Sequence, residues 1–357
     1  MKYFVIAGEA SGDLHGSDLV VALKANDPSA EIIGMGGDKM EHAGMVLFRH
    51  YSEYSFMGFV EVLFNLSKIR RLLKAIKAKI KTENPDHVVL IDYGGFNLKI
   101  AKFCKELGVP VHFYILPKVW AWNEKRVRKI RDYVDQGYCI FPFEEAYFKG
   151  HGVNAVYVGN PVVNQINRFL SNHTVSRGKY IALLPGSRDQ EIYRILPTLL
   201  RYARKSPDKR FKLAAHDVSK YDGIDLPENV EICDKSTYET VANAKAAIVT
   251  SGTANLETAL LKTPQVVVYQ ANRLSYEIGK RVVKIKYISP VNLILDRLLI
   301  KELIQSDFDV VHLEEEVEAC LTGHTRKQIL EGYNELADIL ENKNAGEVVA
   351  KHIIAYQ

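Results

Sequence analysis

Along the first half of the chain, short aliphatic runs alternate with longer stretches whose apolar residues recur every three or four positions. The runs predicted to be strands are KYFVIAG, EIIGMGG, HVVLIDYGG and VHFYILP, at residues 2–8, 31–37, 87–95 and 111–117. Helical spacing fills the segments between them, such as residues 14–27 and 103–108. This alternation predicts βαβ units and a parallel sheet.

A second series of the same kind begins near residue 179. Its predicted strands lie in KYIALLPGSR, FKLAAH, VEICD, AAIVTSG and QVVVYQ, at residues 179–188, 211–216, 230–234, 246–252 and 265–270. A Gly-Asn-Pro breaker within residues 159–166 separates the two series. We therefore expect an α/β protein of two Rossmann-like, doubly wound parallel-sheet domains, residues 1–163 and 164–335. Residues 336–357 are predicted to be a C-terminal helix, and its packing on the first domain is one arrangement that the sequence leaves open.

Open parallel sheets bind ligands beyond the carboxyl ends of their strands, so two such domains are expected to form a cleft where those ends face each other. The stretch TSGTANLETAL, residues 250–260, follows one predicted strand. In a structural interpretation, Thr253 caps the next helix and Glu257 favours its positive end. In a functional interpretation, the N–H groups and hydroxyls of Ser251, Gly252 and Thr253 hold an anionic group. Glu257 then binds vicinal hydroxyls, and a nucleoside diphosphate carries both features.

The stretch LLPGSRDQEI places Gly186 and Ser187 at a second strand-to-helix turn, followed by Arg188. Backbone N–H groups and a permanently charged guanidinium suit a diphosphate leaving group. The alternative is a plain turn with a surface arginine. Two phosphate-competent loops in one domain favour a nucleotide site, and neither loop matches a P-loop, so a kinase or ATPase is not indicated.

In the first domain, Asp92 ends a fully apolar strand and is a candidate general base for a sugar hydroxyl. Capping of the next turn is the alternative. In GEASGD, the residues Glu9, Ser11 and Asp13 either line the acceptor side of the cleft or cap the following helix. The glycines of GEASGD do not match G-x-G-x-x-G, and no ribose-binding acid ends the next strand, so a dehydrogenase is not predicted.

The composition of the 357 residues, 47% hydrophobic and 25% charged, is that of an ordinary globular protein. Its four cysteines lie far apart without metal-ligand spacing, so we predict no metal site, no disulfide framework and a reducing compartment. No cofactor is predicted either. The first residues are expected to be a strand and not a signal peptide, and no uncharged apolar run reaches about 18 residues.

The net charge of +4 is modest, but residues 66–81 contain seven lysines or arginines and no acid. Their apolar positions, with Leu72, Ile76 and Ile80 among them, fall at helical spacing. A helix with a solvated basic face explains this pattern, and so does peripheral attachment to an anionic membrane, because residues 56–66 add further apolar surface. The membrane patch is predicted to comprise Phe56, Met57, Phe59, Val60, Leu63, Phe64, Arg70, Arg71, Lys74 and Lys77. Nucleic acid is disfavoured because no nucleic-acid motif accompanies the charge.

Six stretches, in the same order over nearly the full length, resemble the family of lipid-A-disaccharide synthases. They are GEASGDLHG, FMGFVEV, LIDYGGFN, VWAWNEKRV, LLPGSR and TSGTANLETAL. The resemblance implies a bacterial inverting glycosyltransferase of GT-B architecture that acts at the cytoplasmic face of the inner membrane. It implies transfer of 2,3-diacylglucosamine from UDP to the 6-hydroxyl of 2,3-diacylglucosamine 1-phosphate, which gives a β-1,6 disaccharide and UDP without a required metal.

The resemblance also assigns residues. It implies that UDP is bound by Arg188, Ser251, Thr253 and Glu257, with Asn292, Glu302 and Gln305 as weaker candidates in YISPVNLILDRLLIKELIQ. Where the family often reads PDFN after its first acid, this chain has Gly94 and Gly95, so Asp92 is the sole carboxylate of that motif. Likewise, Asn160 stands where a histidine is common.

Several alternatives stay open. Another GT-B enzyme, such as a UDP-N-acetylglucosamine epimerase or a peptidoglycan glycosyltransferase, is one alternative, and an epimerase has no need for the apolar patch. A non-catalytic nucleotide-sugar or lipid-binding protein is a further alternative. The sequence leaves the acyl-chain preference open, and it is compatible with a monomer or a homodimer.

Overall fold

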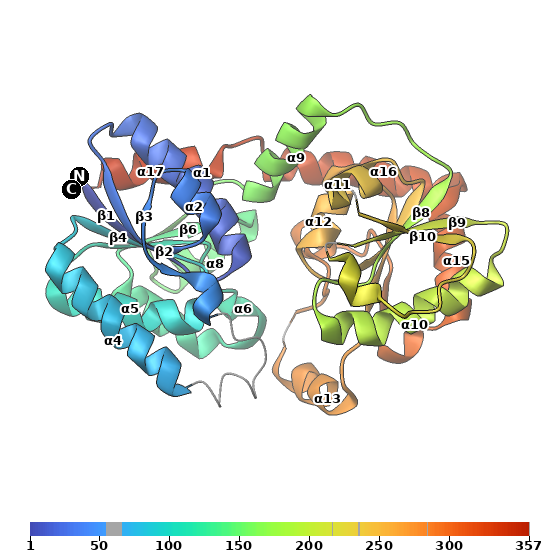
Figure 1. The fold of residues 1–357 in the computed structure, drawn as a ribbon, viewed down its shortest axis with the longest axis horizontal. Coiled ribbons are helices and arrows are strands. Elements are labelled where there is room, and N and C mark those ends of the chain that lie inside the picture. Colours follow the sequence, from blue (N-terminus) through green and yellow to red (C-terminus); the bar gives the residue numbers. More distant parts are fainter. Residues whose placement is uncertain (55–65, 216, 235, 284, 357) are drawn as a thin grey trace. The chain divides into compact units, whose positions relative to one another are not determined.

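The computed structural model describes residues 1–357 except 55–65, 216, 235, 284 and 357. The chain divides into two compact units, each built around its own parallel sheet (Figure 1). Unit 1 contains Met1–Pro161 and Lys343–Gln357, whereas unit 2 contains Val162–Asn342. The last segment of the chain therefore belongs to the first unit, although it follows the second in sequence.

The sheet of unit 1 has seven strands in the order β3-β2-β1-β4-β5-β6-β7, and the pairings are parallel. The strands are β1 (Lys2–Ala7), β2 (Glu31–Gly36), β3 (Val46–His50), β4 (His87–Ile91), β5 (Val111–Tyr114), β6 (Gln136–Cys139) and β7 (Ala155–Tyr157). Strand β4, HVVLI, is buried along its whole length, as expected of a strand covered on both faces. The strand order reverses between β1 and β4, and ligands of open α/β sheets bind at such a switch point.

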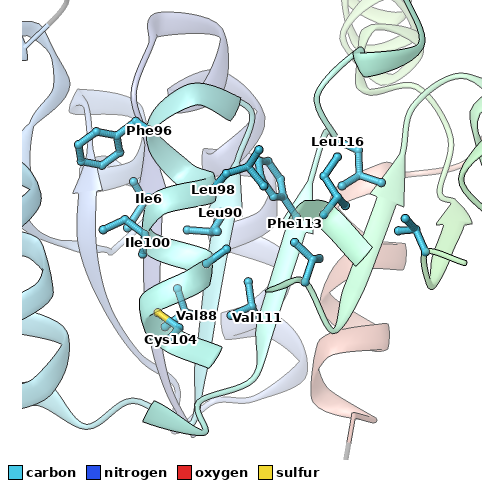
Figure 2. Packing of buried hydrophobic residues seen from close by; sticks show 14 of the residues in the cluster. Ile6, Val88, Leu90, Phe96, Leu98, Ile100, Cys104, Val111, Phe113 and Leu116 are labelled. Carbon is cyan, nitrogen blue, oxygen red and sulfur yellow. The ribbon is translucent and has the colours of Figure 1, made fainter. Parts of the chain in front are cut away.

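Helices cover both faces of this sheet. One face packs against α1 (Ala10–Asn26), α2 (Asp38–His42) and α17 (Ala345–Ile354). The other face packs against α4 (Leu66–Glu83), α5 (Gly94–Leu107), α6 (Val119–Trp122), α7 (Val127–Tyr133) and α8 (Pro142–Gly150). Figure 2 shows the core on that second face, where side chains of α5 meet those of β4 and β5. Two 3₁₀ turns, η1 (Tyr51–Tyr54) and η2 (Glu124–Arg126), complete the described part of unit 1.

Helix α4 follows the predicted amphipathic spacing. Leu72, Ile76 and Ile80 are buried in the core, and Ile69 and Leu73 pack against it with part of their surface exposed. One stripe of α4 is therefore apolar and faces the sheet, which leaves the cations of this helix on the remaining surface.

The sheet of unit 2 has six strands in the order β10-β9-β8-β11-β12-β13, again with parallel pairings. The strands are β8 (Tyr180–Leu184), β9 (Arg210–Ala214), β10 (Val230–Cys233), β11 (Ala246–Thr250), β12 (Gln265–Tyr269) and β13 (Glu302–Ile304). The switch point of this sheet lies between β8 and β11. The prediction of an α/β protein with two doubly wound parallel sheets is thus confirmed.

In unit 2, α10 contacts α15, which also contacts the next helix along the chain, α16, while α12 contacts α11, α14 and α16. In Figure 1, α10 lies on one side of the strands of this sheet, and α11 and α12 lie on the other. The helices are α9 (Pro161–Asn172), α10 (Asp189–Lys205), α11 (Thr237–Ala242), α12 (Thr253–Leu260), α13 (Arg273–Val282), α14 (Pro290–Leu295), α15 (Val310–Leu321) and α16 (Gly323–Leu340). The 3₁₀ turns are η3 (Val218–Tyr221) and η4 (Gln305–Asp307).

Candidate active site

The two loops predicted to bind phosphate follow neighbouring strands of unit 2. Strands β8 and β11 pair in parallel, with Val249 opposite Leu184 at the end of the ladder. Both loops therefore leave the same edge of the sheet, on the two sides of its switch point. This is the place where open α/β sheets bind nucleotides.

The loop after β8 is held by an acid that the sequence analysis did not single out. Gly186 has a φ of +116°, and a side chain there would bring its Cβ within 2.4 Å of a carboxylate oxygen of Glu191. Glu191 Oε2 accepts the backbone N–H groups of Ser187 at 3.2 Å and Arg188 at 3.4 Å. The capping-box spacing, an acid three residues after the N-cap Arg188, is the signal that could have identified Glu191.

Two cations stand beside this loop. The guanidinium of Arg188 lies 3.5 Å from Glu191 Oε1, and its side chain is 62% exposed, so the cation is accessible to a ligand. Lys220 Nζ donates to the carbonyl oxygen of Ser187 at 2.9 Å and pairs with Asp189 at 2.7 Å. Arg188, which the sequence analysis predicted to bind the diphosphate, therefore has Lys220 as a neighbour. The sequence analysis did not identify Lys220, because no motif contains it.

The loop after β11 is open on one side and anchored on the other. Gly252 is the N-cap of α12 with a φ of +150°, and no described atom lies within 4 Å of the position that a Cβ would take. Ser251 donates its hydroxyl to the carbonyl oxygen of Ile288 at 3.0 Å, so this hydroxyl supports the fold. Thr253, the first residue of α12, is exposed.

Glu257 is half-buried one turn into α12, and its carboxylate has a fixed partner. Glu257 Oε1 accepts the hydroxyl of Tyr238 at 2.8 Å, and the same hydroxyl lies 3.2 Å from Gln165 Oε1. Burial raises the pKa of the Glu257 carboxyl, and the hydrogen bond from Tyr238 opposes that shift. The carboxylate is thereby held in one orientation with its second oxygen available for another donor.

Three residues of the segment 287–305 have partners within unit 2. Glu302 accepts the backbone N–H groups of Ile288 and Ser289, each at 3.0 Å, and a side-chain N–H of Asn292 at 2.8 Å. Asn292 is fully buried and its carbonyl oxygen accepts two further backbone N–H groups. Gln305 bonds the backbone of Ala271 through both ends of its amide. Glu302, which Asn292 orients, therefore holds the 288–289 loop, and the carbonyl oxygen of Ile288 in that loop accepts the Ser251 hydroxyl, whereas Gln305 holds Ala271.

In unit 1, the GEASGD loop and the Asp92 loop meet at the switch point. They follow β1 and β4, which are paired neighbours. Gly8 approaches Tyr93 so closely that a Cβ would lie 2.3 Å from the tyrosine ring. Asp92 and Tyr93 both have left-handed φ values, +46° and +50°, which turn the chain sharply before α5 begins at Gly94.

The carboxyl group of Asp92 sits in a partly desolvated position with a lysine nearby. Its Oδ1 accepts the N–H of Tyr93 at 2.8 Å. Burial raises the pKa of Asp92, whereas the charge of Lys118 and the N–H of Tyr93 oppose the rise. Asn97 donates to the carbonyl oxygens of Ile91 and Asp92 and fixes the turn. A carboxylate with a raised pKa is suited to take a proton near neutral pH.

The three polar residues of GEASGD have different environments. Asp13 is buried and accepts the backbone N–H groups of Gly37 at 2.7 Å, Met40 at 3.1 Å and Lys39 at 3.2 Å. It therefore closes the N-terminus of α2, and not of its own helix. Glu9 and Ser11 are exposed at the start of α1.

The apolar members of the predicted membrane patch, Phe56, Met57, Phe59, Val60, Leu63 and Phe64, lie outside the described residues. Its cations Arg70, Arg71 and Lys74 are exposed on α4, whereas Lys77 is half-buried. Within the described part of the chain, no helix has the length and apolar content needed to cross a membrane. The same described residues contain no group of three or more His, Cys, Asp or Glu side chains placed to hold a metal ion.

Solved structures with a similar fold include glycosyltransferases and epimerases. The glycotransferase of kitacinnamycin superposes with a TM-score of 0.69 at 12% identity, covering 99% of this chain and 98% of that one. A UDP-GlcNAc 2-epimerase from Neisseria meningitidis, bound to UDP-GlcNAc, superposes with a TM-score of 0.63 at 10% identity over both full chains. At such low identity the likeness shows the fold alone, which is the GT-B fold.

Sequence relatives are much closer. Lipid-A-disaccharide synthase from Myxococcus xanthus is 35% identical over 370 residues, covering 99% of this chain and 97% of the relative. The enzyme of the same name from Syntrophus aciditrophicus is 36% identical over 368 residues, covering 97% and 95%. A family profile described as Lipid-A-disaccharide synthetase matches residues 3–354. This chain, a glycosyltransferase of GT-B fold, therefore belongs to the lipid-A-disaccharide synthase family.

Proposed function

We propose that the protein transfers 2,3-diacylglucosamine from UDP to the 6-hydroxyl of 2,3-diacylglucosamine 1-phosphate. The products are a β-1,6-linked disaccharide 1-phosphate and UDP. Membership of the family supports the reaction class. The observation that carries the assignment of a nucleotide-sugar donor is the pair of small-residue loops that leave adjacent strands β8 and β11 at one switch point.

On the donor side, unit 2 holds UDP. The N–H groups of Ser187 and Arg188 and the N-terminus of α12 at Thr253 face the diphosphate, with the guanidinium of Arg188 as the fixed cation. Gly186 and Gly252 give the backbone its left-handed turns at these loops. The diphosphate competes with Glu191 for the two N–H groups, because a dianion is the stronger acceptor.

The remaining donor-side residues act on the nucleoside or support the loops. Glu257, held by Tyr238, accepts the ribose hydroxyls. Ser251, Asn292 and Gln305 act through the backbone, since their polar groups bond the loops of unit 2.

On the acceptor side, Asp92 takes the proton from the 6-hydroxyl as that oxygen attacks the anomeric carbon of the donor. The new C–O bond forms on the face opposite UDP, and the electron pair of the breaking bond leaves with the β-phosphate, so the configuration inverts. Positive charge at Arg188 stabilises the charge that develops on UDP. Glu9 and Ser11 line the acceptor side, and Asp13 supports their loop through α2.

The acylated substrates place the reaction at a membrane. We assign the cations Arg70, Arg71, Lys74 and Lys77 of α4, with the apolar residues that precede this helix, to peripheral contact with anionic lipid. The corresponding location is the cytoplasmic face of the bacterial inner membrane.

The test is a transfer assay with purified protein, UDP-2,3-diacylglucosamine and 2,3-diacylglucosamine 1-phosphate, in which disaccharide and UDP are both measured. Equimolar appearance of the two products supports the proposal. Tight UDP binding without turnover supports a binding protein instead, and formation of an epimerised UDP-sugar without acceptor supports an epimerase.

Variants separate the two halves of the mechanism. Asp92→Asn should lower kcat by about 10²- to 10⁴-fold and leave the Kd for UDP unchanged, because the amide keeps the bond from Tyr93 but accepts no proton. Arg188→Ala should weaken both UDP binding and turnover, whereas Arg204→Ala, at the far end of α10, should weaken neither. Retained kcat in Asp92→Asn overturns the assignment of the base.

A further inference from the structure

A cavity of about 540 Å³ in unit 1 carries an unbalanced positive charge. It lies among α4, α5 and α7, the first two of which run side by side in Figure 1. Its cationic lining residues are Lys77, Lys99, Lys102, Arg126 and Lys129. The other lining residues are apolar, aromatic or glycine, and no described aspartate or glutamate lines the cavity.

These cations have few acidic partners. Only Lys102 has a carboxylate within salt-bridge distance among the described residues, since it lies 3.8 Å from Glu106 on the solvent side of α5. Lys77 lies over the ring of Phe103, and Arg126 lies over the ring of Trp122. Five like charges around one hollow repel one another, and an anion in the hollow relieves that repulsion.

The largest described cavity of unit 2 has a different charge pattern. The larger cavity at the opposite, amino-terminal edge of the unit 2 sheet is also lined by cations, but acids such as Asp208 and Glu231 lie among them. Two of its lysines are paired, Lys209 with Glu318 at 2.8 Å and Lys212 with Glu231 at 3.4 Å. Its charge is thus largely balanced within the chain.

The cavity also reaches the first turn of α5. Gly94 and Gly95, which line it, are the first two residues of this helix, and their N–H groups have no acceptor inside the helix by position. The positive end of the α5 dipole therefore adds to the charge of the lysines. A Cβ at Gly95 would meet nothing within 4 Å, so the space beside Gly95 is open, whereas one at Gly94 would lie 2.6 Å from Pro117.

The position of the cavity suggests what the anion belongs to. The helix turn that lines it begins two residues after Asp92, the proposed base. In the proposed reaction, a sugar bound with its 6-hydroxyl at Asp92 carries its 1-phosphate on the same ring, so that phosphate has to be held near this loop. The volume is in the range of small-ligand pockets, and Leu73, Leu98 and Tyr133 supply apolar walls.

We propose that this cavity is a binding site for the phosphate monoester of the acceptor sugar. The inference rests on the proposed function and adds a specificity device to it. A monoester carries nearly two negative charges at neutral pH, and the lysines with the α5 N-terminus bind it with charge-assisted hydrogen bonds. An acceptor without the phosphate lacks these contacts, so the cavity selects the 1-phosphate sugar over its unphosphorylated analogue.

The test compares two triple variants with equal loss of charge. Lys99→Gln/Lys102→Gln/Lys129→Gln removes three exposed cations of the cavity. Lys125→Gln/Arg128→Gln/Arg131→Gln removes three exposed cations from the neighbouring η2 and α7 that do not line it. All six side chains are at the surface, so both proteins should fold, and circular dichroism with the Kd for UDP checks this.

Binding is measured by calorimetry with full-length protein and 2,3-dihexanoylglucosamine 1-phosphate below its micelle concentration, with the unphosphorylated sugar as comparison. The cavity triple should lose at least about tenfold in affinity for the phosphorylated sugar and none for the other. The control triple should stay within about twofold for both. Equal affinities in the two triples overturn the inference.

Three further outcomes distinguish failure of the phosphate-site proposal from failure of the proposed function. If the wild type binds the sugar phosphate through the cavity but transfers nothing, the proposed function is wrong and the site stands. If transfer is normal and the cavity triple keeps the wild-type ratio of kcat/KM for phosphorylated over unphosphorylated acceptor, the site is wrong and the function stands. If only binding to phosphatidylglycerol vesicles falls in the cavity triple, the cavity takes lipid headgroups, and the acceptor assignment is overturned.

Discussion

Lys118 controls the charge state of the proposed base. Burial raises the pKa of Asp92, and the positive charge of Lys118 is the largest effect that opposes the rise. The proposed mechanism requires the deprotonated carboxylate of Asp92, so it predicts that activity is lost as the pH falls through this pKa. Lys118→Met should therefore raise the pKa further and move the acidic limb of the kcat/KM profile to higher pH.

The pH profile also gives the control. Lys118→Arg keeps the charge and should leave the acidic limb within a few tenths of a pH unit of the wild type. Lys118 is exposed, so the loss of its charge should change the stability little. An acidic limb that stays in place in Lys118→Met would mean that Asp92 does not titrate in the rate-determining step.

At the same scale, sequence reasoning identified acids by their place after a strand but could not tell which way they point. Asp92 and Glu257 are half-buried with one oxygen bound by the chain, which fits a ligand role. Asp13 also follows a strand, yet all three of its hydrogen bonds come from the N-cap and first turn of α2. The difference lies in contacts 24 to 27 residues away in sequence, which no local pattern contains.

At the scale of single elements, α4 combines an apolar stripe that packs on the core with a basic surface that has no packing role. Its stripe of Leu72, Ile76 and Ile80 was predictable because a helix repeats every 3.6 residues. The function of the basic surface of α4 was not predictable, because a solvated helix face and a membrane-binding face show the same pattern of cations. Similarly, most strands were predicted from their aliphatic runs, but β3, β6, β7 and β13, which lie toward the sheet edges, were not. The contacts of Glu191 and Glu302 with loop N–H groups were not predicted either, because they depend on tertiary structure.

The membrane role of α4 can be measured directly. Arg70→Gln/Arg71→Gln/Lys74→Gln removes three exposed cations, each contributing about 1 kcal/mol near an anionic surface. The partition coefficient onto phosphatidylglycerol vesicles should fall about a hundredfold at low salt, and the difference should shrink as salt is added. Sedimentation of vesicles with bound protein measures it.

A matched variant shows whether position matters. The triple Lys125→Gln/Arg128→Gln/Arg131→Gln removes the same charge from η2 and α7, and its partition coefficient should fall by less. Equal losses in the two proteins would show that net charge alone attracts the protein to vesicles, with no oriented contact through α4.

At the scale of the whole molecule, the two units differ in which parts of the chain they need in order to fold. Unit 2 is one continuous segment, whereas unit 1 is completed by the last residues of the chain. Helix α17 lies on α1, where Gly346 approaches the backbone of Asp18 so closely that a Cβ would lie 3.0 Å away. Val349, Ala350 and Ile353 of α17 are fully buried in the core of unit 1.

Deletion of residues 343–357 should therefore destabilise unit 1 selectively. Burial of an aliphatic side chain contributes about 1.5–3 kcal/mol, and a domain is stable by only about 5–15 kcal/mol, so the loss of α17 removes a large share. Unit 2 keeps its sheet and both donor loops, and its Kd for UDP should stay within about threefold of the wild type. Calorimetric scans with and without UDP measure both effects.

UDP at a hundred times its Kd stabilises the unit that binds it by about 2.7 kcal/mol, which identifies the transition of unit 2. The milder variant Gly346→Val should lower only the other transition, because its side chain separates α17 from α1. Loss of UDP affinity in either protein would show that the donor site depends on unit 1.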